Sequence, residues 1–139
     1  IDESLAAYAE ALTYVPADPD VLNNYAVALR TAGRPGDAIP ALEAALARAP
    51  DEPSFHMNLA IAHRTLEHWA LAVPHYEAWM AVTPTPTDAG PLYDLAYCYE
   101  QLDRPADAVR IYNLFLGMVR TSDPDAAERA TERLEGLSH

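Results

Sequence analysis

The chain has 139 residues, half of them apolar, which suits one folded domain with a continuous core and argues against disorder. Nine arginines, no lysine and 21 acidic residues give a net charge of −12, which argues against nucleic acid and anionic lipid as partners. The single cysteine, Cys98, excludes an intrachain disulfide, and no apolar run approaches the ~20 residues of a membrane span.

The spacing of apolar residues and of helix-breaking residues predicts eight helices. They cover residues 2–14, 20–32, 36–48, 54–66, 70–82, 89–101, 105–119 and 124–136. The chain starts at Ile1 in what resembles mid-helix, so we expect an excised fragment. Ser122-Asp123-Pro124 is a start signal for the last helix, whose largely polar surface suits a cap at the end of a repeat array.

Two patterns recur along the chain. The first is an Ala-rich segment closed by a proline: Pro16, Pro50 and Pro84 lie 34 residues apart, and a fourth segment, Ala108-x3-Tyr112-x2-Phe115, lacks the proline. The second places large residues at i, i+3 and i+7 with a small one at i+4. It reads Leu22-x2-Tyr25-Ala26-x2-Leu29, His56-x2-Leu59-Ala60-x2-His63 and Leu92-x2-Leu95-Ala96-x2-Tyr99.

These two patterns together resemble the tetratricopeptide repeat over nearly the whole chain. The resemblance implies an all-α fold, a right-handed α-solenoid of antiparallel helix pairs forming a single domain. We expect a half repeat at 1–17, repeats at 19–52, 53–86 and 89–121, and a capping helix at 122–139.

In this family the first helices of successive repeats line a concave groove where peptides bind. The resemblance therefore implies partner-binding residues on the side of each first helix opposite its packing positions. They are Asn23, Asn24, Val27 and Arg30, then Met57, Asn58, Ile61 and Arg64, and last Tyr93, Asp94, Tyr97 and Gln101.

Two features of this set have competing interpretations. Asn24 and Asn58, one repeat apart with Asp94 in the equivalent place, could hold a peptide backbone or be ordinary polar surface residues. Arg30 and Arg64, followed by Glu100, could bind a partner carboxylate, or they could be solvated or paired within the chain. The apolar and aromatic members could line the groove or face the core. We expect a groove that is basic toward the N-terminal repeat and acidic and aromatic toward the C-terminal one.

The sequence offers no catalytic site. His56 and His63, like His68 and His75, are spaced i, i+7, whereas metal pairs on one helix usually need i, i+3 or i, i+4. We therefore interpret His56 and His63, which occupy large packing positions of their repeat, as half-buried structural imidazoles. Cys98 has no histidine nearby in sequence, and no phosphate-binding loop or nucleophile motif occurs. We expect no metal, no cofactor and no enzymatic activity.

The leading hypothesis is an adaptor or scaffold that binds a segment of another protein in its groove. One alternative is a regulatory or substrate-recruiting arm of a larger enzyme. Another is self-association through the N-terminal half repeat, by way of Leu5, Tyr8, Leu12 and Val15. The Arg- and Ala-rich composition favours a bacterial source. A cytoplasmic location is favoured, and a periplasmic one is open if a signal segment was removed.

Overall fold

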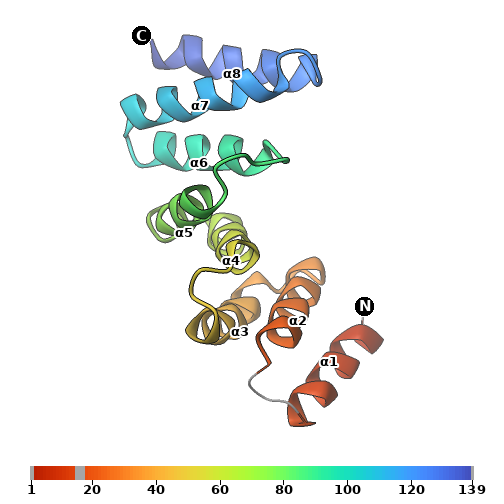
Figure 1. The fold of residues 1–139 in the computed structure, drawn as a ribbon. Helices are drawn as coiled ribbons and strands as arrows, with labels where there is room; N and C mark the ends of the chain where they lie inside the picture. Colours follow the sequence, from red (N-terminus) through yellow and green to blue (C-terminus); the bar gives the residue numbers. More distant parts are fainter. Residues whose placement is uncertain (1, 15–17, 139) are drawn as a thin grey trace. The chain divides into compact units, whose positions relative to one another are not determined.

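A computed structural model describes residues 2–14 and 18–138, and over these residues the chain forms eight helices and no strand (Figure 1). Every helix begins and ends within one residue of its predicted limits, which confirms the all-α fold of paired helices. Val15 and Pro16 lie outside the described residues. The helices are α1 (Asp2–Tyr14), α2 (Pro19–Thr31), α3 (Pro35–Arg48), α4 (Pro53–Thr65), α5 (Trp69–Val82), α6 (Gly90–Gln101), α7 (Pro105–Val119) and α8 (Pro124–Leu137).

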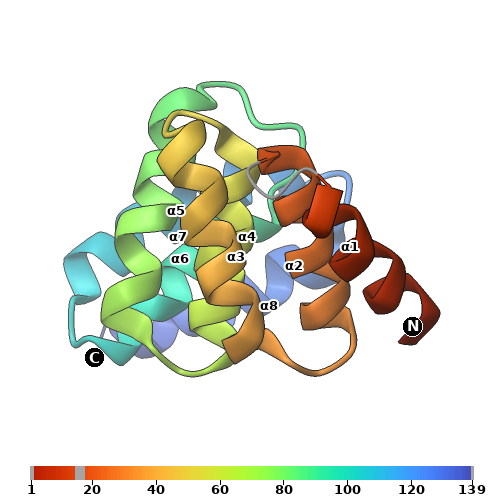
Figure 2. The same cartoon turned by 90° about the horizontal axis from the view of Figure 1, so that it is seen from below.

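The helices pack as consecutive neighbours. The three hairpins α2–α3, α4–α5 and α6–α7 form the main packing, and α1 packs on α2, α3 on α4 and α7 on α8. Both ribbon views show α1 alongside α2 (Figure 1 and Figure 2). The chain divides into two compact units, an N-terminal unit of Ile1–Thr83 and a C-terminal unit of Pro84–His139.

Proline and aspartate fix several helix starts. Proline stands in the first turn of α2, α3, α4, α6, α7 and α8, where its missing N–H would have no partner in the helix anyway. Asp18 Oδ1 accepts from the backbone N–H groups of Asp20 and Val21, at 2.9 and 3.1 Å. Asp123 Oδ1 accepts from the N–H of Ala126 at 3.0 Å, as its start signal predicts.

One backbone bend closes the first helix of each hairpin. Gly33, Glu67 and Asp103 all have positive φ, at 78°, 60° and 55°. In each case the N–H of the next residue donates to a carbonyl five residues before it. The bonds run from Arg34 to Leu29, His68 to His63 and Arg104 to Tyr99, each at 2.9 Å. The shared geometry is a left-handed C-terminal cap, which satisfies carbonyl groups that the helix leaves open.

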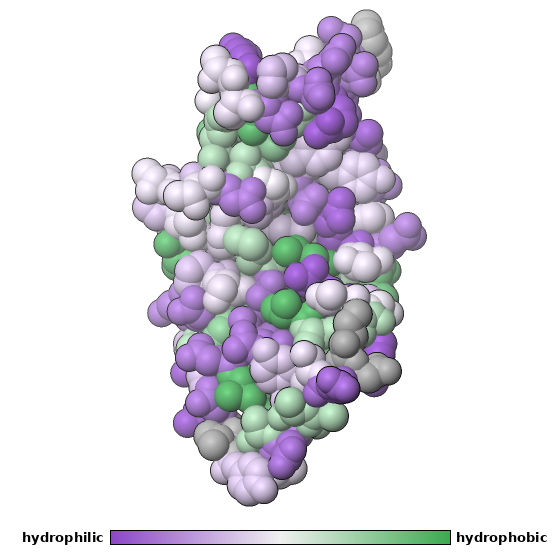
Figure 3. All heavy atoms as spheres, turned by 90° about the vertical axis from the view of Figure 1, so that its right-hand side faces the viewer, coloured by the Kyte–Doolittle hydropathy of each residue, from purple (hydrophilic) through white to green (hydrophobic). Residues whose placement is uncertain are grey.

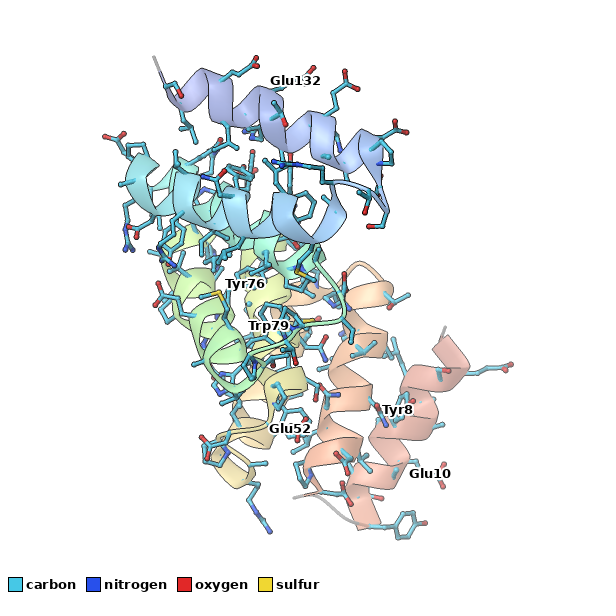
Figure 4. All side chains as sticks on the ribbon, turned by 45° about the horizontal axis from the view of Figure 1, so that its top comes forward. Tyr8, Glu10, Glu52, Tyr76, Trp79 and Glu132 are labelled. Atoms are coloured by element: carbon cyan, nitrogen blue, oxygen red, sulfur yellow. The ribbon has the colours of Figure 1, made fainter. Side chains whose placement is uncertain are left out.

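The core of the N-terminal unit lies between α2, α3 and α4. Its buried residues are Leu22, Ala26, Leu29, Ala38, Ala41, Leu42, Ala45, Phe55 and Leu59. Leu5 and Leu12 of α1 pack partly against this core. Tyr8 is half-buried on the side of α1 that faces α2, whereas Glu10 points away (Figure 4). Much of the apolar surface that suggested self-association is therefore already used within the chain.

Candidate partner-binding faces

The predicted residues of the N-terminal unit share one accessible face on α2 and α4, two first helices that contact each other. Asn24 is exposed. The other members are half-buried: Asn23, Val27, Arg30, Met57, Asn58, Ile61 and Arg64. The apolar members thus keep part of their surface in solvent, while Leu22, Ala26, Leu29, Leu59 and Ala60 fill the core positions of the same helices. We call this surface the α2–α4 face.

An amide pair links the two helices across this face. Asn58 Nδ2 donates to Asn23 Oδ1 at 2.8 Å. Asn58 thus bonds to Asn23, and the expected role of Asn24 and Asn58 toward a peptide backbone stays a prediction. An amide has both donors and acceptors, so Asn23 Nδ2 and Asn58 Oδ1 keep capacity for a further bond. The pair holds these two groups in a fixed place on the α2–α4 face.

The arginines of this face lie in the last turns of α2 and α4, at Arg30 and Arg64. The Nε atom of Arg30 is buried and has no hydrogen-bond partner within residues 2–14 and 18–138. A buried donor without a partner costs about 1–3 kcal/mol, and an incoming carboxylate would recover that cost. The guanidinium group of Arg30 is therefore not fully satisfied by hydrogen bonds within this part of the chain.

In the C-terminal unit, the aromatic residues of α6 are already engaged by other helices. The ring centroid of Tyr93 lies 5.4 Å from that of Tyr112 and 5.3 Å from that of Phe115, both in edge-on geometry. The guanidinium carbon of Arg133 lies 4.8 Å from the ring centroid of Tyr97. Asp94 is half-buried and Gln101 exposed.

The last helix, α8, places the positive charge of Arg133 beside α6, in the part of the groove that was predicted to be acidic and aromatic. Arg133 donates to both carboxylate oxygens of Glu100, with its closest contact at 2.7 Å from Nη2 to Oε2. This hydrogen bond is the main cause of a raised pKa at Arg133. Burial, together with the Glu100 carboxylate, raises the pKa of Tyr112. The polar surface of α8 predicts a cap and does not predict this ion pair. The sequence signal for it is the i, i+4 spacing of Arg129 and Arg133, which places both arginines on one side of the helix.

Two hollows lie between α6 and α8, with α7 and the 87–89 loop contributing to the first. The first has a volume of about 470 Å³, and its lining includes Asp88, Tyr93, Asp94, Met118, Asp123 and Arg129. The second, of about 540 Å³, is lined by Glu100, Glu132, Arg133 and Leu137 among others, and shares Tyr93 and Arg129 with the first. Hydrophilic side chains dominate the surface near the C-terminal helix in Figure 3.

We expect the Arg133→Gln substitution to lower the free energy of unfolding by about 1–2 kcal/mol, because Glu100 loses its partner. The Glu100 side chain is only 13% exposed, so water replaces the lost contact incompletely. Urea unfolding followed by circular dichroism measures the change. Arg129→Gln, at an exposed position one turn earlier on α8, serves as the control. Equal stability of the two variants would contradict this account.

The histidines of the α4–α5 hairpin form a cluster. His56 Nδ1 lies 3.3 Å from His75 Nδ1, and His56 Nε2 lies 2.6 Å from the carbonyl oxygen of Pro50. The His63 ring stacks on His75 with centroids 6.0 Å apart, and its centroid is 5.8 Å from that of His68. His63 is buried at 7% exposure. The sequence spacing pairs His56 with His63 and His68 with His75. It does not show that the two pairs contact each other across the α4–α5 hairpin.

This environment favours the neutral form of His63 and His75. Burial, with smaller contributions from His56 and His63, lowers the pKa of His75 to about 4. Burial and His68 also lower the pKa of His63, and Glu43 partly opposes them. Among the described residues, no three His, Cys, Asp or Glu side chains converge as metal ligands would. Cys98 is fully buried.

No helix within residues 2–14 and 18–138 has the length and apolar character that crossing a bilayer requires. The described helices and their exposed first-helix faces define a helical repeat protein. A family model, the Tetratricopeptide repeat, matches residues 1–53 and 26–89, which together span more than half of the chain. The chain belongs to the tetratricopeptide repeat family.

Solved structures with the same fold have low sequence identity to this chain. MamA protein has a TM-score of 0.83 at 19% identity, covering 98% of this chain and 74% of its own. MamA from Desulfovibrio magneticus RS-1 has a TM-score of 0.80 at 18% identity, covering 99% and 83%. The Yersinia enterocolitica type III secretion chaperone SycD, solved with a peptide of the translocator YopD, has a TM-score of 0.74 at 16% identity, covering 86% and 91%. No curated protein matches the sequence.

Proposed function

We propose that this chain is an adaptor or scaffold module that binds a segment of a partner protein on the exposed faces of its first helices. The observation that carries the proposal is the Asn58–Asn23 hydrogen bond, which fixes two amides side by side on the α2–α4 face. Half-exposed Val27, Met57 and Ile61 lie on the same face. Amides that meet a peptide backbone, next to adaptable apolar side chains, suit recognition of an extended segment.

Membership of the repeat family supports this proposal, and so does the SycD structure, in which a protein of the same fold is solved with a peptide. We propose no catalytic role. The second hypothesis is a recruiting arm of a larger enzyme, in which the same face would hold a substrate protein. Self-association has less support, because Leu5 and Leu12 already pack against the core.

The test is capture of a partner from an extract of the source organism by an immobilised wild-type chain and by the Arg30→Glu/Ile61→Glu variant. We expect recovery of a specific partner to fall at least about tenfold, since two contacts worth about 1 kcal/mol each are replaced by repulsion. The matched control is Arg48→Glu/Leu71→Glu, at exposed positions on α3 and α5. Equal recovery by all three proteins, each folded by circular dichroism, would move the binding site away from the first helices.

A further inference from the structure

The two hollows of the C-terminal unit adjoin at Tyr93 and Arg129 and together form one surface, the α6–α8 trough. The trough follows α8 from Asp123 to Leu137. A helical rise of 1.5 Å per residue gives it a length of ~20 Å, which matches about six extended residues. Its lining includes Tyr93, Phe115, Met118, Val119 and Leu137, so apolar groups can pack there.

The charge of the trough selects the kind of segment that fits it. Five carboxylates and two guanidinium groups line it, a formal charge of −3 over the described lining. They belong to Asp88, Asp94, Glu100, Asp123, Glu132, Arg129 and Arg133. Arg133 is bonded to Glu100, so its charge is already matched. Asp88 and Asp123 each accept a backbone N–H through Oδ1, which holds both carboxylates in the lining of the first hollow.

From this geometry we infer that the α6–α8 trough binds a short basic segment of a partner protein. The aliphatic stems of lysine or arginine side chains pack on Tyr93 and Met118, and their charged ends meet the carboxylates. This inference rests on the proposed function and names the partner chemistry for the C-terminal unit. The net charge of −12 acts in the same direction, since it draws basic chains toward the whole molecule.

The experiment uses the three methionines as separate reporters. Met118 lines the trough, Met57 lies on the α2–α4 face and Met80 lies on α5. The chain is labelled with ¹³C at the methionine methyl groups and titrated to millimolar concentration with the peptide acetyl-Lys-Ala-Lys-Leu-Lys-Gly-amide. A peptide with glutamate in place of each lysine is the ligand control. We expect a saturable shift of the Met118 resonance with the lysine peptide and no shift with the glutamate peptide.

Two charge variants are expected to change the affinity in opposite directions. Misfolding would weaken binding in both, so it can be told apart from a charge effect. Glu132→Lys should weaken binding about threefold, and Arg129→Glu should tighten it about threefold, as single exposed charge pairs do. Glu132 is labelled on α8 in Figure 4. The matched control is Glu135→Lys, which makes the same charge change at an exposed position of α8 outside both hollows.

Several outcomes would overturn the inference. One is an unmoved Met118 resonance at millimolar lysine peptide, and another is tighter binding of the glutamate peptide. A shift at Met57 alone would also overturn it, while leaving the α2–α4 face as the binding surface. Failure of the proposed function has a different signature, because partner capture would then be insensitive to the Arg30→Glu/Ile61→Glu variant.

Discussion

Unfolding of the Leu59→Ala variant is expected to require about 3 kcal/mol less free energy than unfolding of the wild-type chain. Leu59 is 1% exposed and belongs to the buried cluster that joins α2, α3 and α4. Removing three carbon atoms there loses burial of apolar surface and leaves a cavity that a close-packed interior fills only partly. Urea unfolding followed by circular dichroism measures the change.

The matched control is Leu71→Ala on α5, where the side chain is 55% exposed. We expect this substitution to change the free energy of unfolding by no more than ~0.5 kcal/mol. A comparable loss in both variants would mean that the cluster around Leu59 does not carry the stability of the N-terminal unit.

Stability of the wild-type chain is expected to fall as the pH drops from about 6.5 toward 4, in part because of His75. Its pKa is about 4 in the folded chain, against 6.5 for an ordinary histidine. The unfolded chain therefore takes up a proton first, and acid favours unfolding within this window. The contribution is full above pH 6.5 and fades below it. After a discount for partial solvent exposure it amounts to about 1 kcal/mol between pH 7 and pH 5.

The hydrogen bonds of His56 set the arrangement of protons between His56 and His75. The Nε2–H of His56 donates to the Pro50 carbonyl, so its Nδ1 accepts from the Nδ1–H of a neutral His75. His56 and His63 add to the effect of burial in lowering the pKa of His75. Glu43 is the acidic group that acts on His63.

Measuring the free energy of unfolding from pH 7.5 to pH 5 in wild type and His75→Gln separates this contribution from that of the carboxylates. The variant should lose less stability on acidification, whatever its stability at neutral pH. Leu71→Ala, at an exposed position on α5, removes no titratable group, so it is the control and should keep the wild-type slope. Identical slopes for wild type and His75→Gln would exclude the cluster as a source of acid sensitivity.

The fold was predictable because each helix start and end depends on local chemistry. Pro19, Pro53 and Pro105 begin helices, and Gly33 closes one, so the limits follow from the nearest residues. The 34-residue spacing then repeats the same hairpin along the chain, and within the N-terminal unit α3 packs on α4.

The candidate site was predictable only in part, because its details depend on pairs far apart in sequence. Helix phase places Asn23, Asn24 and Asn58 near one face, but only side-chain geometry decides that Asn58 bonds to Asn23. Arg133 reaches Glu100 across 33 positions, and the spacing within α8 does not reveal where that helix lies against α6. The binding role of these residues stays a prediction.

The left-handed bends at Gly33, Glu67 and Asp103 bear on where this chain can vary in length. A glycine, a glutamate and an aspartate produce the same bend, so the corner within each hairpin is defined by main-chain hydrogen bonds and tolerates different side chains. Length changes are then best tolerated at the joints between one hairpin and the next. The Thr83–Asp88 segment, which lies between α5 and α6, is such a joint, and the border between the two compact units falls within it.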